Sequence, residues 1–96
     1  MKYQDLVWVR KPTKEEEEVM KQQPTWEHEA GQWPARYDAR QESFLVIHGG
    51  GSITTPEGRI YRFEVGDFVT CAREFDCTWE VKDYIKKHYI FNYFED

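Results

Sequence analysis

Short stretches of alternating apolar and polar residues run through the chain from Trp26 onward, and turn-forming residues separate them. The stretches recur at roughly the 8–12-residue spacing of all-β sandwiches and barrels. Strands are expected over residues 25–30, 33–39, 44–48, 52–55, 60–64, 68–71, 77–81 and 85–94. Three glycines at 49–51 are predicted to form a hairpin turn between two of these strands. The pattern therefore predicts a mainly β domain.

The first quarter of the chain has a different character. Charged residues dominate positions 11–23, and Pro24 ends this segment because proline cannot continue a helix. Thr13 followed three residues later by Glu16 matches a capping box, which predicts a short helix. Residues 3–9 are predicted to form a further strand that adds to an edge of the sheet or to a neighbouring subunit. We therefore expect residues 1–24 to form a strand and a short helix that pack on the β domain of residues 25–96.

The charge balance and the cysteine content exclude several classes of protein. The chain has 96 residues and a net charge of −5, whereas nucleic-acid and membrane-surface partners require basic patches. Its longest apolar run, residues 44–47, is far shorter than the roughly 20 residues of a membrane span. No apolar leader precedes residue 6, and only Cys71 and Cys77 are present. These features predict a cytoplasmic protein with reduced thiols that binds neither nucleic acid nor membrane.

Six residues separate Glu42 from Gly49. This spacing resembles the first motif of the cupin superfamily, which runs Gly, five residues, His-x-His, three or four residues, Glu, six residues, Gly. The His-x-His slots of the motif fall on Arg36 and Asp38. Both histidines of this motif are therefore absent from the chain.

A second spacing begins at Gly66. The second cupin motif runs Gly, five residues, Pro-x-Gly, two residues, His, three residues, Asn. Gly66 is kept, while the later slots hold Ala72, Glu74, Cys77 and Val81. A thiol therefore stands where the third histidine of a cupin metal site is expected.

Further positions resemble one group of small single-domain cupins, which is related to the cupin domains of ureidoglycine aminohydrolase and of an ethanolamine-utilisation protein. The resemblance implies an all-β fold, a cupin-type double-stranded β-helix or jelly-roll barrel over residues 25–96, preceded by the short helix. It also implies a pocket at the open end of the barrel, into which the motif residues point. The similar positions are Lys11-Pro12-Thr13, Trp26-Glu27, Tyr37-Asp38, Glu42, Gly66-Asp67, Cys77, Trp79-Glu80-Val81 and Lys87-His88-Tyr89.

The same resemblance raises the question of a metal, because cupins hold transition metals through three His and one Glu. Arg36 cannot lose its proton and cannot be a ligand, and its charge beside Asp38 and Glu42 could replace that of a divalent ion. We therefore expect no metal cofactor. The alternative is one divalent transition metal held by Asp38, Glu42 and Cys77, with His88 as a fourth ligand.

Two interpretations of the pocket residues remain open. Arg36, Asp38 and Glu42 could form an internal ion network that neutralises itself, or they could grip a small zwitterionic or carboxylate-bearing ligand. In the second case Arg36 binds the anion, and Trp79 or Tyr89 packs on the apolar part of the ligand.

The expected function is small-molecule binding. The alternative is a metal-assisted enzyme acting on a small nitrogen-containing or carboxylate substrate, and no catalytic residue is assigned. The candidate ligand-binding residues are Arg36, Asp38, Glu42, Cys77, Trp79 and Tyr89.

Strand alternation also assigns side chains to faces. Cys77, Trp79 and Val81 are predicted to point inward, and Lys86-Lys87 to face solvent. Residues 44–47 are apolar on both faces, so another sheet, the N-terminal segment or a second subunit must cover the outer face. Together with the apolar residues 6–9, this surface predicts a homodimer. The expected aromatic core is Trp33, Phe44, Phe63, Phe68, Trp79 and Phe91.

Overall fold

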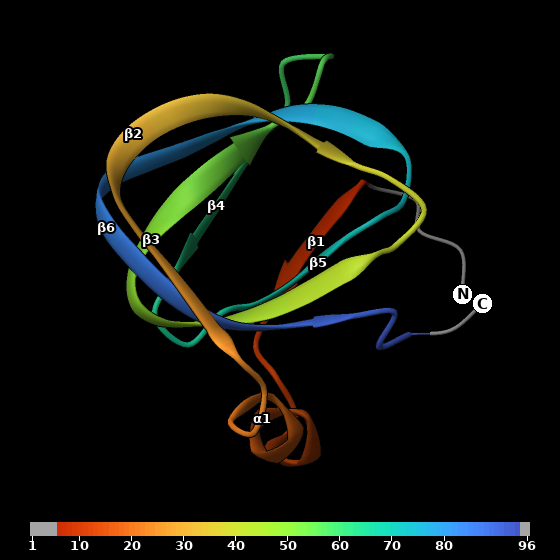
Figure 1. The fold of residues 1–96 in the computed structure, drawn as a ribbon, viewed down its shortest axis with the longest axis vertical. Helices are drawn as coiled ribbons and strands as arrows, with labels where there is room; N and C mark the ends of the chain where they lie inside the picture. Colours follow the sequence, from red (N-terminus) through yellow and green to blue (C-terminus); the bar gives the residue numbers. More distant parts are fainter. Residues whose placement is uncertain (1–5, 95–96) are drawn as a thin grey trace.

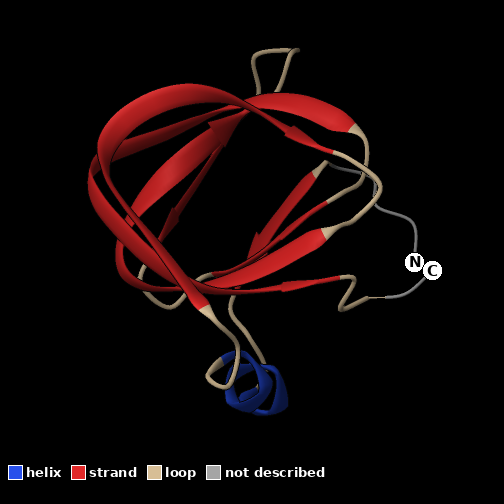
Figure 2. Ribbon diagram, in the orientation of Figure 1, coloured by secondary structure: helices blue, strands red, loops and turns tan. Residues whose placement is uncertain are grey.

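The computed structural model describes residues 6–94, which form one antiparallel sheet wrapped into a barrel and one helix (Figure 1). Strands make up most of the described chain and the helix only a small part of it, so the prediction of a mainly β domain with a short N-terminal helix is confirmed (Figure 2). No helix among the described residues is long and apolar enough to cross a membrane. The elements are β1 (Val7–Arg10), α1 (Lys14–Met20), β2 (Thr25–Tyr37), β3 (Glu42–Thr54), β4 (Ile60–Glu64), β5 (Phe68–Cys71) and β6 (Phe75–Phe91).

The strand order places β3 and β6 at the centre of the sheet. The order is β1-β5-β3-β6-β2, with β4 paired to β3 outside this path. β1 pairs with β5 at the end of this order, so the N-terminal strand adds to an edge of the sheet, which is one of the two places predicted for it. Of the strand predicted over residues 3–9, residues 3–5 lie outside the described part of the chain.

Three long, curved strands replace pairs of predicted short ones. β2, β3 and β6 each continue through a segment for which the sequence predicts a loop between two strands. The prediction of a hairpin turn at the three glycines is therefore wrong. The glycines instead lie inside β3, where the pairing with β6 shifts register. Gly49 has a φ of +65°, and a Cβ atom there would collide with the carbonyl oxygen of Tyr84. Glycine is thus required because the bent strand passes very close to β6.

Helix α1 begins as the sequence predicts. The Thr13 hydroxyl accepts a hydrogen bond from the Glu16 backbone N–H, and the Glu16 carboxylate accepts one from the Thr13 N–H. The Arg10 guanidinium donates to the same carboxylate at 2.8 Å and thereby ties the helix to β1. This hydrogen bond is the main cause that lowers the pKa of Glu16 to about 2.

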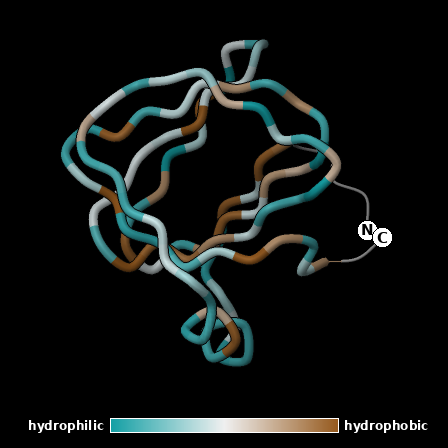
Figure 3. The backbone as a smooth tube through the Cα atoms, in the orientation of Figure 1, coloured by the Kyte–Doolittle hydropathy of each residue, from teal (hydrophilic) through white to brown (hydrophobic). Residues whose placement is uncertain are grey.

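The helix also covers the outer face of β3. Most of α1 is hydrophilic (Figure 3), but its last residue, Met20, is fully buried against Leu45 and Phe68. The apolar outer face of residues 44–47 is therefore covered by the N-terminal segment, one of the three covers that the sequence allowed. One of the two reasons for expecting a homodimer is thereby removed, and the dimer itself stays a prediction.

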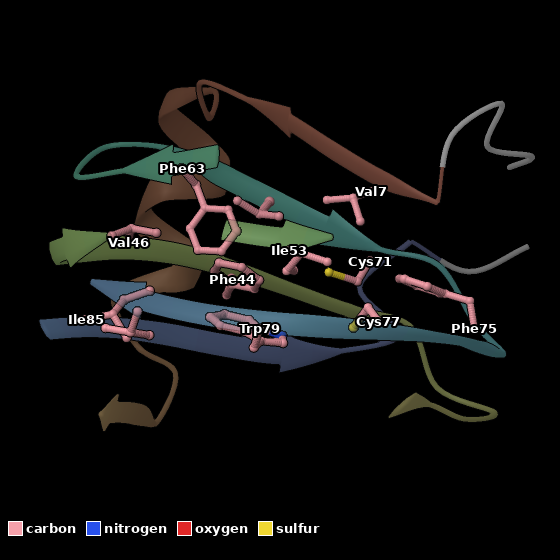
Figure 4. Close-up of a cluster of buried hydrophobic side chains, with 12 residues drawn as sticks. Val7, Phe44, Val46, Ile53, Phe63, Cys71, Phe75, Cys77, Trp79 and Ile85 are labelled. Carbon is pink, nitrogen blue, oxygen red and sulfur yellow. The ribbon is translucent and has the colours of Figure 1, made fainter. Parts of the chain in front are cut away.

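The main core lies inside the barrel. Phe44, Phe63 and Trp79 point toward one another from β3, β4 and β6 (Figure 4), with ring centroids 5.2–5.6 Å apart. Cys77, Trp79 and Val81 are buried on the inner face of β6, as predicted. The assignment of Phe91 to the core is wrong, because its ring is 38% exposed at the end of β6.

Glu74 provides a test of the second motif. It occupies the slot where that motif has glycine, and its φ of 58° lies in the left-handed region that glycine tolerates best. We predict that Glu74→Gly raises the free energy of unfolding by about 1 kcal/mol, because it removes the steric cost of this conformation. Urea denaturation measures the change.

Glu64→Gly is the matched control, since Glu64 is an exposed residue within strand β4. Glycine in an ordinary strand position should lower stability by about 0.5–1 kcal/mol. Equal destabilisation by both substitutions would show that Glu74 is unstrained.

Candidate functional site

A cavity of about 360 Å³ opens between the inner faces of the long strands. Aromatic side chains form much of its wall, and both acidic and basic groups reach it. Because β2 and β6 pair along most of their length, residues far apart in the sequence meet here. The lining residues are Trp26, Trp33, Ala35, Arg36, Tyr37, Asp38, Arg40, Glu42, Trp79, Lys87 and Phe91.

A buried ion pair lies at the centre of the cavity wall. The Lys87 ammonium donates to Oε2 of Glu42 at 2.9 Å, and the two side chains are only 5% and 10% exposed. The other carboxylate oxygen, Oε1, accepts a hydrogen bond from the Tyr37 hydroxyl at 2.8 Å. The Tyr37 oxygen in turn accepts a hydrogen bond from the indole N–H of Trp79 at 3.3 Å. Both oxygens of the carboxylate are therefore satisfied within the barrel.

Aromatic rings surround the Lys87 ammonium. Its nitrogen lies 4.0 Å from the ring centroid of Phe44, 4.8 Å from that of Trp79 and 5.1 Å from that of Trp26. The faces of such rings attract a cation, most strongly where water is excluded. The prediction that Lys87 faces solvent is wrong. Lys87 lies two residues after the buried Ile85, on the same inward face of β6, and is 4% exposed.

The hydroxyl of Tyr37 stays protonated at neutral pH. Burial, together with the nearby Cys71 and the Glu42 carboxylate, raises its pKa well above the usual value. Tyr37 therefore acts as a hydrogen-bond donor to Glu42 rather than as an anion. Tyr37 is not among the site residues that the sequence predicts.

Arg36 and Asp38 lie on the rim of the cavity rather than at its centre. Their side chains are 51% and 81% exposed, and they form an ion pair of 3.2 Å, as the sequence suggested. Arg36 also pairs with Asp76 at 3.2 Å. The expected pairing of Arg36 with Glu42 is wrong, because the cation beside Glu42 is Lys87.

The inward residues of β2 show how the first motif aligns. Ala35 and Tyr37 pack against the core, while the residues between and beyond them are exposed. With four residues between His-x-His and Glu, which the motif permits, the histidine slots fall on Ala35 and Tyr37. The assignment of these slots to Arg36 and Asp38 is therefore wrong, since it places the motif on the solvent face of the strand.

The remaining candidate residues differ in how they lie relative to the ion pair. Cys77 is buried, and burial together with nearby carboxylates raises the pKa of its thiol to about 11. His88 faces away from the cavity, and its Nδ1 lies 2.8 Å from the backbone oxygen of Gln23. Tyr89 lines a smaller adjoining cavity of about 270 Å³, together with Glu42 and Lys87. The structure thus brings Tyr89 to the pair, whereas His88 is held elsewhere.

Comparison with known proteins agrees with this architecture. The model of the EutQ-like cupin domain family matches residues 15–89, which is most of the chain. The chain belongs to the EutQ-like cupin family. A crystal structure of a DUF861 family protein from Thermotoga maritima has 34% sequence identity and a TM-score of 0.80. The alignment covers 88% of this cupin and 97% of the Thermotoga protein, and it confirms the cupin-type barrel.

A second solved structure shares the fold alone. It is a protein of unknown function of the DUF861 family from Pseudomonas syringae pv. tomato, with 22% identity and a TM-score of 0.63. The alignment covers 70% of this cupin and 28% of the Pseudomonas protein. None of the curated proteins matches the sequence.

The donor set of this cupin does not fit the three-His, one-Glu metal site of the superfamily. Ala35 has no donor, Tyr37 is a protonated phenol and Cys77 a protonated thiol. Glu42 is already paired with a cation. Among residues 6–94, no group of three or more His, Cys, Asp and Glu side chains could hold a metal ion. The alternative ligand set of Asp38, Glu42, Cys77 and His88 is not assembled.

The ion pair generates a prediction about stability. Lys87→Met leaves the buried Glu42 carboxylate without its cation and should lower the free energy of unfolding by about 3–5 kcal/mol. The double variant Lys87→Met, Glu42→Gln removes both charges and should be more stable than Lys87→Met alone. Urea denaturation of the single and double variants measures this coupling.

Lys86→Met is the matched control, because Lys86 is next in the chain and lies on the other face of β6. It should change stability by less than about 0.5 kcal/mol. If the changes in the free energy of unfolding caused by the Lys87 and Glu42 substitutions simply add in the double variant, the two side chains do not interact.

Proposed function

We propose that this cupin binds a small carboxylate-bearing molecule with a flat apolar part, and that it does so without a metal. The single observation that supports this is the cavity in which a Lys–Glu pair lies among tryptophan rings. A volume of about 360 Å³ suits a small organic molecule, since ligand pockets start at about 300 Å³.

The charge of the cavity favours an anion. Three of the lining residues, Arg36, Arg40 and Lys87, are cationic, against the two anionic residues Asp38 and Glu42. This excess of one positive charge among the lining residues contrasts with the net charge of −5 of the whole chain, and Asp76, which pairs with Arg36 from outside the lining, offsets it. Arg36 and Arg40 on the rim supply the planar, charge-assisted hydrogen bonds that suit a carboxylate.

The walls of the cavity favour a flat apolar group. Trp33 and Trp79 lie with their rings nearly parallel, at 9° and with centroids 5.9 Å apart, and Trp26 meets both edge-on. Trp26 and Trp33 are only partly buried, so a ligand can contact them without displacing the core. A ring or short chain of a ligand packs against these indoles while its carboxylate stays at the rim.

Binding is tested by titrating the intrinsic tryptophan fluorescence with benzoate and with benzylamine, which have the same ring and opposite charge. Benzoate should quench the fluorescence saturably because Trp26, Trp33 and Trp79 line the cavity. Arg36→Gln should weaken benzoate binding about tenfold, the value of one charge-assisted hydrogen bond.

Arg62→Gln is the matched control. Arg62 is an exposed arginine that lines a different cavity, formed by residues of β3, β4 and β6, and its loss should leave benzoate binding unchanged. Equal affinity for benzylamine, or the absence of saturable quenching by any small carboxylate, would overturn the proposal.

A further inference from the structure

The Lys87 ammonium is more than a fixed charge, because it is a primary amine at the wall of a cavity. Among the described residues, Lys87 is the lysine that is buried, and it lines both the cavity of about 360 Å³ and the smaller one of about 270 Å³. Its nitrogen lies 2.9 Å from a carboxylate oxygen that can accept its proton. Lysine amines form imines with carbonyl substrates, and a carboxylate in hydrogen-bond contact with the amine can carry the protons that this reaction moves.

We propose that Lys87 captures a small carbonyl compound, such as a 2-oxo acid, as a covalent imine, with Glu42 carrying the protons. This inference rests on the proposed function, since the rim arginines would hold the carboxylate of the same molecule. It adds a carbonyl group next to that carboxylate as the feature that the cavity selects.

The reaction balances within the residues present. Glu42 takes one proton from the Lys87 ammonium, and the free amine forms an N–C bond as the C=O π electrons move to oxygen. That oxygen takes the proton back from Glu42, which then removes a second proton from nitrogen. The C–O bond breaks, the hydroxyl takes the proton from Glu42 and leaves as water, and the nitrogen lone pair forms the C=N bond. The net reaction is ammonium plus carbonyl to iminium plus water.

The surroundings suit the product as well as the reactant. The iminium carries the same single positive charge at the same nitrogen, so Glu42 and the rings of Phe44, Trp79 and Trp26 stabilise both. The Tyr37 hydroxyl holds Oε1 of Glu42 and leaves Oε2, the oxygen facing the amine, to exchange protons. The site thus keeps its charge balance throughout the reaction.

The experiment traps the imine in the wild-type protein. The protein is incubated with pyruvate and cyanoborohydride, digested, and the lysine-bearing peptides are analysed by mass spectrometry for a 1-carboxyethyl group. Because the cavity holds the carbonyl carbon beside the amine, labelling of Lys87 should exceed that of the neighbouring Lys86 by about tenfold or more. Lys87→Arg keeps the charge and should abolish this label, while Lys86→Met should leave it unchanged.

Lactate serves as the matched ligand, because it has a hydroxyl group in place of the carbonyl. Binding of both acids by tryptophan fluorescence, with no excess label on Lys87, would overturn the imine inference and leave the proposed function standing. The absence of a fluorescence response to every carboxylate tested, with no excess label, would overturn both.

Discussion

A buried lysine must keep its charge neutralised, and this requirement organises the residues that line the cavity. The ammonium of Lys87 is almost fully removed from water, where an unpaired charge would cost several kcal/mol. Glu42 supplies the countercharge, and the faces of three aromatic rings supply the remaining contacts. Tyr37 and Trp79 then hold the carboxylate in place through a short chain of hydrogen bonds.

The two central strands make this arrangement possible. β3 carries Glu42 and β6 carries Lys87, and the direct pairing of these strands brings the two side chains to the same inner face. β2 then adds Tyr37 and the tryptophans from the other side of β6. Gly49 permits β3 to pass close to the backbone of β6, the strand that carries Lys87.

Much of the fold followed from the sequence, and the errors at the site have physical causes. The capping box at Thr13 and the inward phase of Trp79 are local signals, and both predictions are confirmed. The prediction of a hairpin at the three glycines is wrong because turns and tightly bent strands both need residues without a side chain. Strand alternation in β6 puts Lys87 on the same inward face as Ile85. A lysine is nevertheless expected at the surface unless a buried partner neutralises it. That partner, Glu42, lies 45 residues away in the sequence.

Lys87 supplies the cation that neutralises the buried Glu42 carboxylate, so Glu42 is not free to bind a divalent ion. Elemental analysis of the purified protein tests it most directly, combined with the melting temperature before and after treatment with a chelator. We predict far less than one equivalent of Zn, Fe, Mn or Ni per chain and an unchanged melting temperature, because a second cation beside Glu42 would be repelled. About one equivalent of metal, lost in Glu42→Ala or Cys77→Ser, would contradict this account.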